Sequence, residues 1–267
     1  MFELIFSVSR TAILEVFFIA VGCILSALVF HFAKDRLKSI RQNYSTDLAI
    51  IVLLSLAGMV LPLDTYGLIP LAATLLVLGF KVYLVAPVLV SNILFNMLVP
   101  FTDAGFVLKS GMGRIMLAFI AGVLAGIMVR ALKINDTLLV KKGVLERCAA
   151  RSSSPRDTIR LTGVCLNIAL PYILLGSASH ILFSAYVFPK IMNWIFSGPI
   201  GTTIPVVFKG YDITTPIFLL GMSILGMLMN LKTFSAILLT LKVRGIIGYF
   251  VYYSVLILIL ALLNFII

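Results

Sequence analysis

Charged side chains are scarce in this sequence. Only 12% of its 267 residues are Asp, Glu, Lys or Arg, about half the share found in soluble domains. Acidic residues are rarer than basic ones, with 10 Asp and Glu against 21 Lys and Arg. A chain with so little charge lacks the polar surface that a soluble globular domain needs, so that class is excluded.

Cysteine is also rare, and its spacing shows no ligand pattern. The three cysteines, Cys23, Cys148 and Cys165, are far apart and form no CxxC pair. Because a disulfide framework or a metal cluster would show characteristic spacings, the sequence supports neither. We expect the three to be ordinary packing residues, with no metal and no cofactor bound.

Signatures of catalysis are missing as well. The chain contains no GxxxxGK[ST], HExxH or GxSxG motif. It also has no polar segment long enough to hold a catalytic domain. These absences argue against an enzyme and against an ATP-driven pump in a single chain.

Long apolar runs dominate what is present. Hydrophobic residues make up 61% of the chain, and the mean hydropathy is +1.17. Several runs reach the roughly 20 residues that cross a bilayer as a helix. The prediction is an all-α, polytopic helical membrane protein, multi-pass in the inner or plasma membrane. The predicted spans lie near 11–33, 83–100, 113–132, 161–185, 213–231 and 245–266.

The basic residues lie in short segments beside the apolar runs. A basic cluster, and no small-residue cleavage site, follows the first run, so we expect that run to be a retained span. The formal charge of +11 fits membrane topology and lipid headgroups better than nucleic acid, which we do not expect as a partner. Residues 133–160 are the longest polar segment, and the positive-inside rule predicts that they are cytoplasmic.

Two titratable residues fall within the apolar runs. Glu15 lies within about one turn of the outer end of the first predicted span, so we expect an interfacial position for it. His180 lies toward the outer end of a later span, and a solvated or hydrogen-bonded role is favoured over proton transfer.

The two halves of the chain match under an ungapped shift. Pro70 and Pro205 lie 135 residues apart, and three further pairs of matching residues share that spacing. Each half has five apolar segments, and an odd number inserts the second half upside down, as in transporters built from inverted repeats. The predicted organisation is a first transmembrane repeat over 1–132, a basic cytoplasmic linker over 133–160 and a second repeat over 161–267.

Short apolar pieces over 47–61 and 67–80 flank the first interruption, PLDTYGLIP. Pro62 removes a backbone donor, Gly67 can adopt conformations closed to other residues, and Pro70 follows, so a regular helix should break here. Each piece is too short to cross alone, which is typical of half-helices or re-entrant segments buried among full spans.

The interruption carries a group of polar side chains. We predict a substrate or ion site built from Asp64, Thr65, Tyr66 and Gly67. A carboxylate at membrane depth is costly and usually marks an ion or proton path, so Asp64 is expected to bind a cation or carry a proton. The alternative is that the break lies at the outer interface and that Asp64 is a solvated turn residue.

A second interruption, SGPIGTTIP, lies between short pieces at 187–197 and 201–210. Its helix breakers are Pro199 and Pro205, and its hydroxyls, Thr202 and Thr203, are expected to face the first break; a plain extracellular turn is the alternative. A third group, Ser91, Asn92 and Asn96, lies on one apolar span. These side chains either line the same cavity or form interhelical hydrogen bonds.

Three stretches resemble a known family. PLDTYGLIPLAATLLVLG, VYLVAPVLVSN and GTTIPVVFKG, the last followed by PIFLLG and a long final span, are similar to motifs of the predicted-permease family. That family includes the ArsP organoarsenical efflux permeases and the YraQ-type proteins. Where those permeases often carry a Cys-x-Cys pair, this chain has Asp64, Thr65 and Tyr66. The resemblance implies a permease, while oxygen ligands favour protons or harder cations over arsenicals.

The sequence thus predicts a secondary transporter that exports a small solute or cation with proton coupling through Asp64. Membrane lipid and the small-molecule or ion substrate are the expected partners. The sequence is also compatible with a homo-oligomer. Two alternatives belong to other classes. One is a non-transporting membrane subunit that anchors a cytoplasmic partner through 133–160, and the other is a passive channel.

Overall fold

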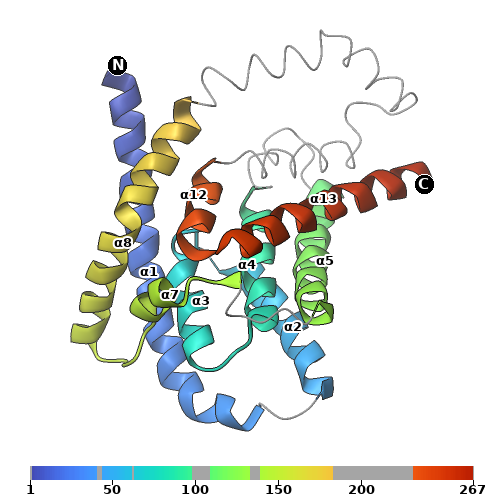
Figure 1. Ribbon diagram of the computed structural model, residues 1–267, viewed down its shortest axis with the longest axis horizontal. Helices are drawn as coiled ribbons and strands as arrows, with labels where there is room; N and C mark the ends of the chain where they lie inside the picture. Colours follow the sequence, from blue (N-terminus) through green and yellow to red (C-terminus); the bar gives the residue numbers. More distant parts are fainter. Residues whose placement is uncertain are drawn as a thin grey trace.

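The protein is described by a computed structural model that covers residues 2–40, 44–61, 63–97, 109–132, 139–182 and 231–266. All the secondary-structure elements longer than an isolated bridge in these ranges are helices, so the all-α class is confirmed for them (Figure 1). The helices are α1 Phe2–Ile40, α2 Tyr44–Val60, α3 Leu68–Val77, α4 Val82–Met97, α5 Lys109–Ala131, α7 Lys142–Cys148, α8 Pro155–Leu182, α12 Leu231–Thr240 and α13 Val243–Ile266.

The predicted spans are matched by helices wherever the structure describes them. Two stretches, Val8–Phe32 of α1 and all of α8, have the length and composition to cross a membrane, and the other apolar stretches in the described ranges are shorter. The number of crossings and the inverted repeat therefore stay predictions. The pieces predicted at 187–197, 201–210 and 213–231 lie outside the described residues, apart from Leu231 at the last boundary. The short helix α12 was not predicted.

The helices form two packed groups. In one group α2, α4 and α5 contact one another, and in the other α1 contacts α3 and α8 while α12 contacts α8. Figure 1 shows α1 and α8 side by side, with α12 between α8 and α4. The short helix α7 lies against α3 and α8, and α13 runs across α4 and α5 at a large angle to them. Because α2 belongs to one group and α3 to the other, the interruption between them joins the two groups.

Small residues allow the helices of the first group to approach closely. A Cβ placed on Gly122 or Gly126 of α5 would lie 3.1 Å or less from atoms of Pro87 on α4. A Cβ on Gly58 of α2 would lie 2.2 Å from Ser91 Oγ. Glycines four residues apart at a helix contact are a packing pattern of membrane helices, where dispersion and not water exclusion holds helices together.

Glycines also bring the interruption against α1 in the second group. A Cβ on Gly22 would lie 2.0 Å from the Gly67 carbonyl oxygen, and a Cβ on Gly67 would lie 2.7 Å from the Phe18 carbonyl oxygen. The backbones of α1 and the interruption therefore touch directly. This contact sets the distance between the interruption and the face of α1 that carries Glu15.

The middle of the basic segment is packed, whereas the sequence predicted a polar linker over 133–160. Residues 139–150 place apolar side chains in the core beside α3 and α12, and Leu139, Leu145 and Cys148 are buried. Val140 forms an antiparallel bridge with Leu241, and the Ala150 amide donates a hydrogen bond to Thr74 Oγ1 at 2.8 Å. The apolar residues interspersed among the basic ones explain the difference, because they are buried while Lys142 and Arg147 stay exposed.

We predict that Gly22→Ala destabilises the protein, because its new methyl group would collide with the Gly67 carbonyl. Overpacking of this kind costs about 1–3 kcal/mol. The matched control is Gly163→Ala on α8, where the added Cβ meets nothing within 4 Å and should stabilise the helix by about 0.5–1 kcal/mol. The midpoints of thermal unfolding in detergent measure both effects. Equal midpoints for the two variants would contradict the close contact.

Candidate functional site

The interruption after α2 is built from a helix end and a short turn. The last hydrogen bond of α2 runs from the Leu61 amide to the Ala57 carbonyl at 3.1 Å. The carbonyls that would continue the ladder need other donors, and Asn92 Nδ2 on α4 donates to Gly58 O at 2.9 Å and to Leu61 O at 2.8 Å. Asn92 therefore forms the interhelical hydrogen bonds that were one of its two predicted roles, and these bonds stabilise the broken end of α2.

Two residues predicted to break the helix act in other ways. Gly67 has φ −66° and ψ −24°, an ordinary helical conformation, so backbone freedom was the wrong reason for it. The close approach to α1 is what requires a glycine there. Pro70 lies in the first turn of α3, where helix amides have no intrahelical partner, so it starts α3 instead of breaking it.

A buried ionic group forms where the interruption meets α1 and α12. Lys232 Nζ lies 2.6 Å from Asp64 Oδ2 and also pairs with the Glu15 carboxylate. The three side chains come from the interruption, from α1 and from α12. They differ in depth: Asp64 is 32% exposed, Lys232 18% and Glu15 0%. Asp64 is thus the member that solvent reaches most easily, and Glu15 is the deepest. We call Glu15, Asp64 and Lys232 the ionic triad.

Two further hydrogen bonds hold the interruption in place beside the ionic triad. The Tyr66 hydroxyl and the Ser235 hydroxyl lie 2.6 Å apart, and both side chains are buried. Ser235 follows Lys232 by three residues on α12, so both side chains face the interruption. The Thr65 amide donates to Asp64 Oδ1 at 2.6 Å, which orients the carboxylate so that its other oxygen faces Lys232.

Helix α8 supports α12 from the other side. A Cβ on Gly176 would lie 2.1 Å from Ser235 Oγ and 3.3 Å from the Lys232 Cα, so only glycine allows this approach. His180, one turn further along α8, lies within electrostatic range of Lys232, and its Nδ1 is buried. His180 is therefore closer to the ionic triad than its predicted solvated position implied.

The remaining predicted site residues divide into two sets. Ser91 is buried and donates to the Pro87 carbonyl at 2.7 Å within its own helix, so it does not join the ionic triad. Asn96 lies in the last turn of α4, and its side chain is outside the described part of the chain. Pro62, Pro199, Thr202, Thr203 and Pro205 also lie outside the described residues. The proposed pairing of the two interruptions stays a prediction.

Sequence reasoning missed two members of the ionic triad. Glu15 was expected at the membrane interface and outside any site, whereas its carboxylate is completely buried and pairs with Lys232. Its depth in the membrane stays a prediction. Lys232 was missed because it follows the last residue of a predicted span, where lysines commonly mark a membrane boundary. Its signal is the sequence MLMNLKTFSAILL, in which one cation is flanked by apolar residues on both sides.

The three cysteines are free and buried in a single core cluster. Cys165 Sγ donates to the Cys148 carbonyl oxygen at 3.8 Å. In the described part of the chain no three His, Cys, Asp or Glu side chains are arranged to hold a metal ion. These cysteines pack beside α3 and α8, as expected from the sequence.

The charges of the ionic triad do not balance. Two carboxylates face one ammonium, so the fully ionised group carries one net negative charge in a largely buried place. An uncompensated buried charge is costly, and one bound proton or one further cation removes it. The arrangement is thus chemically suited to take up and release a single positive charge.

Comparison with protein-family models, curated proteins and solved structures finds no match for this chain.

Removal of the ammonium tests the ionic triad directly. We predict that Lys232→Met destabilises the protein by about 3–5 kcal/mol near neutral pH, because two carboxylates are left buried without a cation. At acid pH the difference in stability between Lys232→Met and the wild type should become smaller, because protonation of the two carboxylates removes their charge. Thermal unfolding over a pH series provides the measurement, with exposed Lys142→Met as the control. A Lys232→Met protein as stable as the control at every pH would argue against the buried pairing.

Proposed function

We propose that this protein is a proton-coupled secondary transporter and that the ionic triad carries the coupled proton. The observation that carries the proposal is the pairing of one lysine with two carboxylates from different segments in a largely buried place. Charged groups at membrane depth are expensive, and they usually mark the path of a proton or an ion.

The distribution of side chains in the described ranges supports a membrane setting. Large apolar side chains lie on the outside, such as Ile13, Phe17 and Leu53, which are all more than 60% exposed. Polar side chains such as Glu15 and Asn92 are completely buried. Contiguous apolar surface on this scale would associate or aggregate in water, whereas lipid solvates it. Two helices with the length and composition of a membrane span agree with this setting.

A proton suits the ionic triad better than a metal cation. The ammonium of Lys232 already occupies the position between the two carboxylates, so a metal ion would have to displace it. A proton needs no such space, because it binds to one carboxylate oxygen. A proton that enters from solvent reaches Asp64 first, because Asp64 is the more exposed acid. While the proton is bound there, the attraction between Asp64 and Lys232 is weaker and Lys232 stays paired with Glu15.

Coupling follows from where the three side chains are attached. Asp64 lies on the interruption that joins the two groups of helices, and Lys232 lies on α12 in the second group. Protonation of Asp64 therefore weakens the attraction between the interruption and α12, the helix that packs on α8. We propose that this change shifts the equilibrium between inward-open and outward-open arrangements of the two groups. Among the described residues, Tyr66 and His180 are further titratable side chains near the ionic triad, and Tyr172 lies near Tyr66.

The resemblance of the interruption to permease motifs agrees with this reading and favours export as the direction. The anchor alternative keeps an exposed basic surface, although the apolar residues of 139–150 are packed. Its basic side chains are Lys142, Arg147, Arg151, Arg156 and Arg160. The passive channel differs from the proposal in its kinetics, and the experiment below separates all three.

We predict that a pH jump produces a transient current in proteoliposomes adsorbed on a solid-supported electrode. Proton uptake by the ionic triad moves charge within the membrane, so this current should appear even without a transported solute. Asp64→Asn and Glu15→Gln should each suppress it, because either change removes the excess carboxylate. The control is Asp157→Asn, which removes an exposed carboxylate from the first turn of α8 and should leave the current unchanged.

Each alternative function gives a different trace. A wild type without any current would favour the anchor, and a sustained current that persists in both carboxylate variants would favour the channel. A transient current of wild-type size in folded Asp64→Asn and Glu15→Gln proteins would overturn the role of the ionic triad. Unfolding midpoints of each variant show whether a lost current reflects lost structure.

A further inference from the structure

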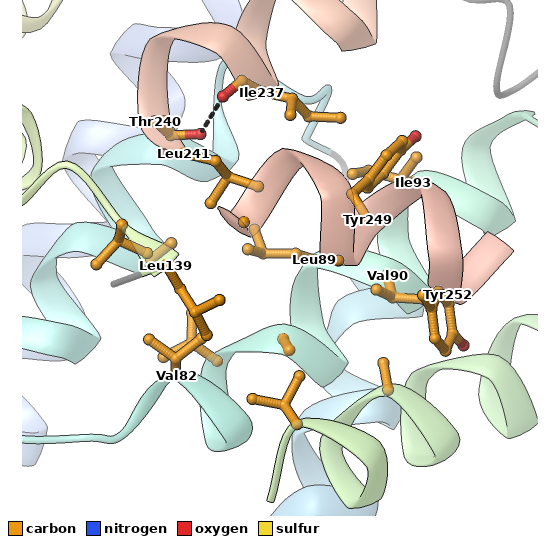
Figure 2. A pocket seen from close by; sticks show the side chains of 18 of the residues that line it. Val82, Leu89, Val90, Ile93, Leu139, Ile237, Thr240, Leu241, Tyr249 and Tyr252 are labelled. Atoms are coloured by element: carbon orange, nitrogen blue, oxygen red, sulfur yellow. Dashed lines mark hydrogen bonds between the residues drawn. The ribbon is translucent and has the colours of Figure 1, made fainter. Parts of the chain in front are cut away.

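A cavity of about 230 Å³ lies beside the ionic triad, between α3, α4, α5, α12 and α13. Figure 2 shows its walls, with Val82 and Leu139 toward one end and Tyr252 toward the other. Residues of both α4 and α13, among them Leu89, Val90 and Tyr249, line the cavity.

The walls of the cavity carry no charged side chain among the described residues. The polar residues that line it are threonines and tyrosines, and two of these have hydroxyls that already bond to backbone. Thr240 Oγ1 donates to the Ala236 carbonyl at 3.0 Å, and the Tyr252 hydroxyl donates to the Ala121 carbonyl. The Tyr249 and Tyr253 hydroxyls are buried without a hydrogen-bond partner among the described residues. A few neutral hydroxyls cannot replace the water shell of an ion, so the cavity disfavours ions and favours uncharged, mostly apolar molecules.

The cavity and the ionic triad share two structural elements. Thr65 lines the cavity, and its neighbour Asp64 belongs to the ionic triad. On α12, Lys232 and Ser235 face the interruption, while Ala236 and Ile237 line the cavity. A displacement of α12 that follows protonation of Asp64 would therefore change the walls of the cavity at the same time.

We propose that this cavity is the substrate site and that the substrate is an uncharged, apolar organic molecule about the size of naphthalene. The inference that the bound molecule is a transported substrate rests on the proposed function. Binding to the cavity is testable without transport. The size follows from comparison with dry apolar cavities, since one of about 150 Å³ binds benzene. A cavity about half as large again accommodates a second fused ring.

The test is equilibrium binding of radiolabelled 1-methylnaphthalene to the full-length protein in lipid nanodiscs. Partition of the probe into lipid is linear in concentration, so a protein site appears as a saturable component. We expect one saturable site per chain in the wild type. Ala236→Phe should abolish it by filling the cavity, and Ala125→Leu on α5 should weaken it from the opposite wall. The control is Ala49→Phe, which adds the same side chain to an exposed position on α2.

The outcomes separate this inference from the proposed function. Saturable binding that both cavity variants reduce and Ala49→Phe leaves intact would support the site. Absence of a saturable component in the wild type would overturn the proposed site. Displacement of the labelled probe by n-decane as effectively as by unlabelled probe would also overturn it, because the cavity would then hold a lipid acyl chain. Glu15→Gln should retain binding while it loses the pH-jump current, so a failure of coupling cannot be mistaken for a failure of the cavity.

Discussion

Pairing of a buried lysine with two carboxylates is the constraint on which the rest of this structure depends. A charge removed from water must be compensated, and Lys232 is compensated only if α1, α12 and the interruption meet within a few ångströms. The glycine contact of Gly22 with Gly67 brings the interruption onto α1. On the other side, Gly176 lets α12 approach α8 closely enough for Lys232 to reach the same point.

The same constraint explains why the interrupted segment needs support from its neighbours. A helix that ends inside an apolar environment exposes carbonyls with no water to bond them. Asn92 supplies donors to two of these carbonyls from α4, and the Tyr66 contact with Ser235 fixes the turn that follows. The polar side chains of the interior are thus concentrated where the backbone is irregular. Within the regular helices of the described ranges, the buried polar side chains are mostly serines and threonines, such as Ser26, Thr74 and Ser91, which bond to carbonyls of their own helix.

Much of the fold is predictable from the sequence, because apolar runs of about 20 residues have few other solutions than helices. The interruption after α2 was predictable for the same kind of local reason, since Pro62, Asp64 and Gly67 stand close together in an apolar run. The cost of a carboxylate at membrane depth is the reason that Asp64 was expected in a site, and that depth stays a prediction. Local pattern is sufficient for features of this kind.

The ionic triad itself was beyond such reasoning. Glu15 and Lys232 lie near opposite ends of the chain, and no local sequence pattern around either residue predicts that they pair. The ten residues of α12 are also too few to stand out from the end of a predicted span, so the helix that positions Lys232 was missed. Gly67 was identified for the wrong reason, because its conformation is ordinary and the tight contact with α1 becomes evident only in three dimensions.

Helix α12 has two faces with different chemistry, and this division has a consequence for how such a protein diverges. Its charged face, with Lys232, is bound to partners on two other segments, so most changes there would be lost to selection. Its cavity face, with Ala236 and Ile237, meets uncharged and mostly apolar neighbours. Under the proposed function, a single apolar substitution on the cavity face would change which molecules fit the cavity while the contacts of the ionic triad stay as they are.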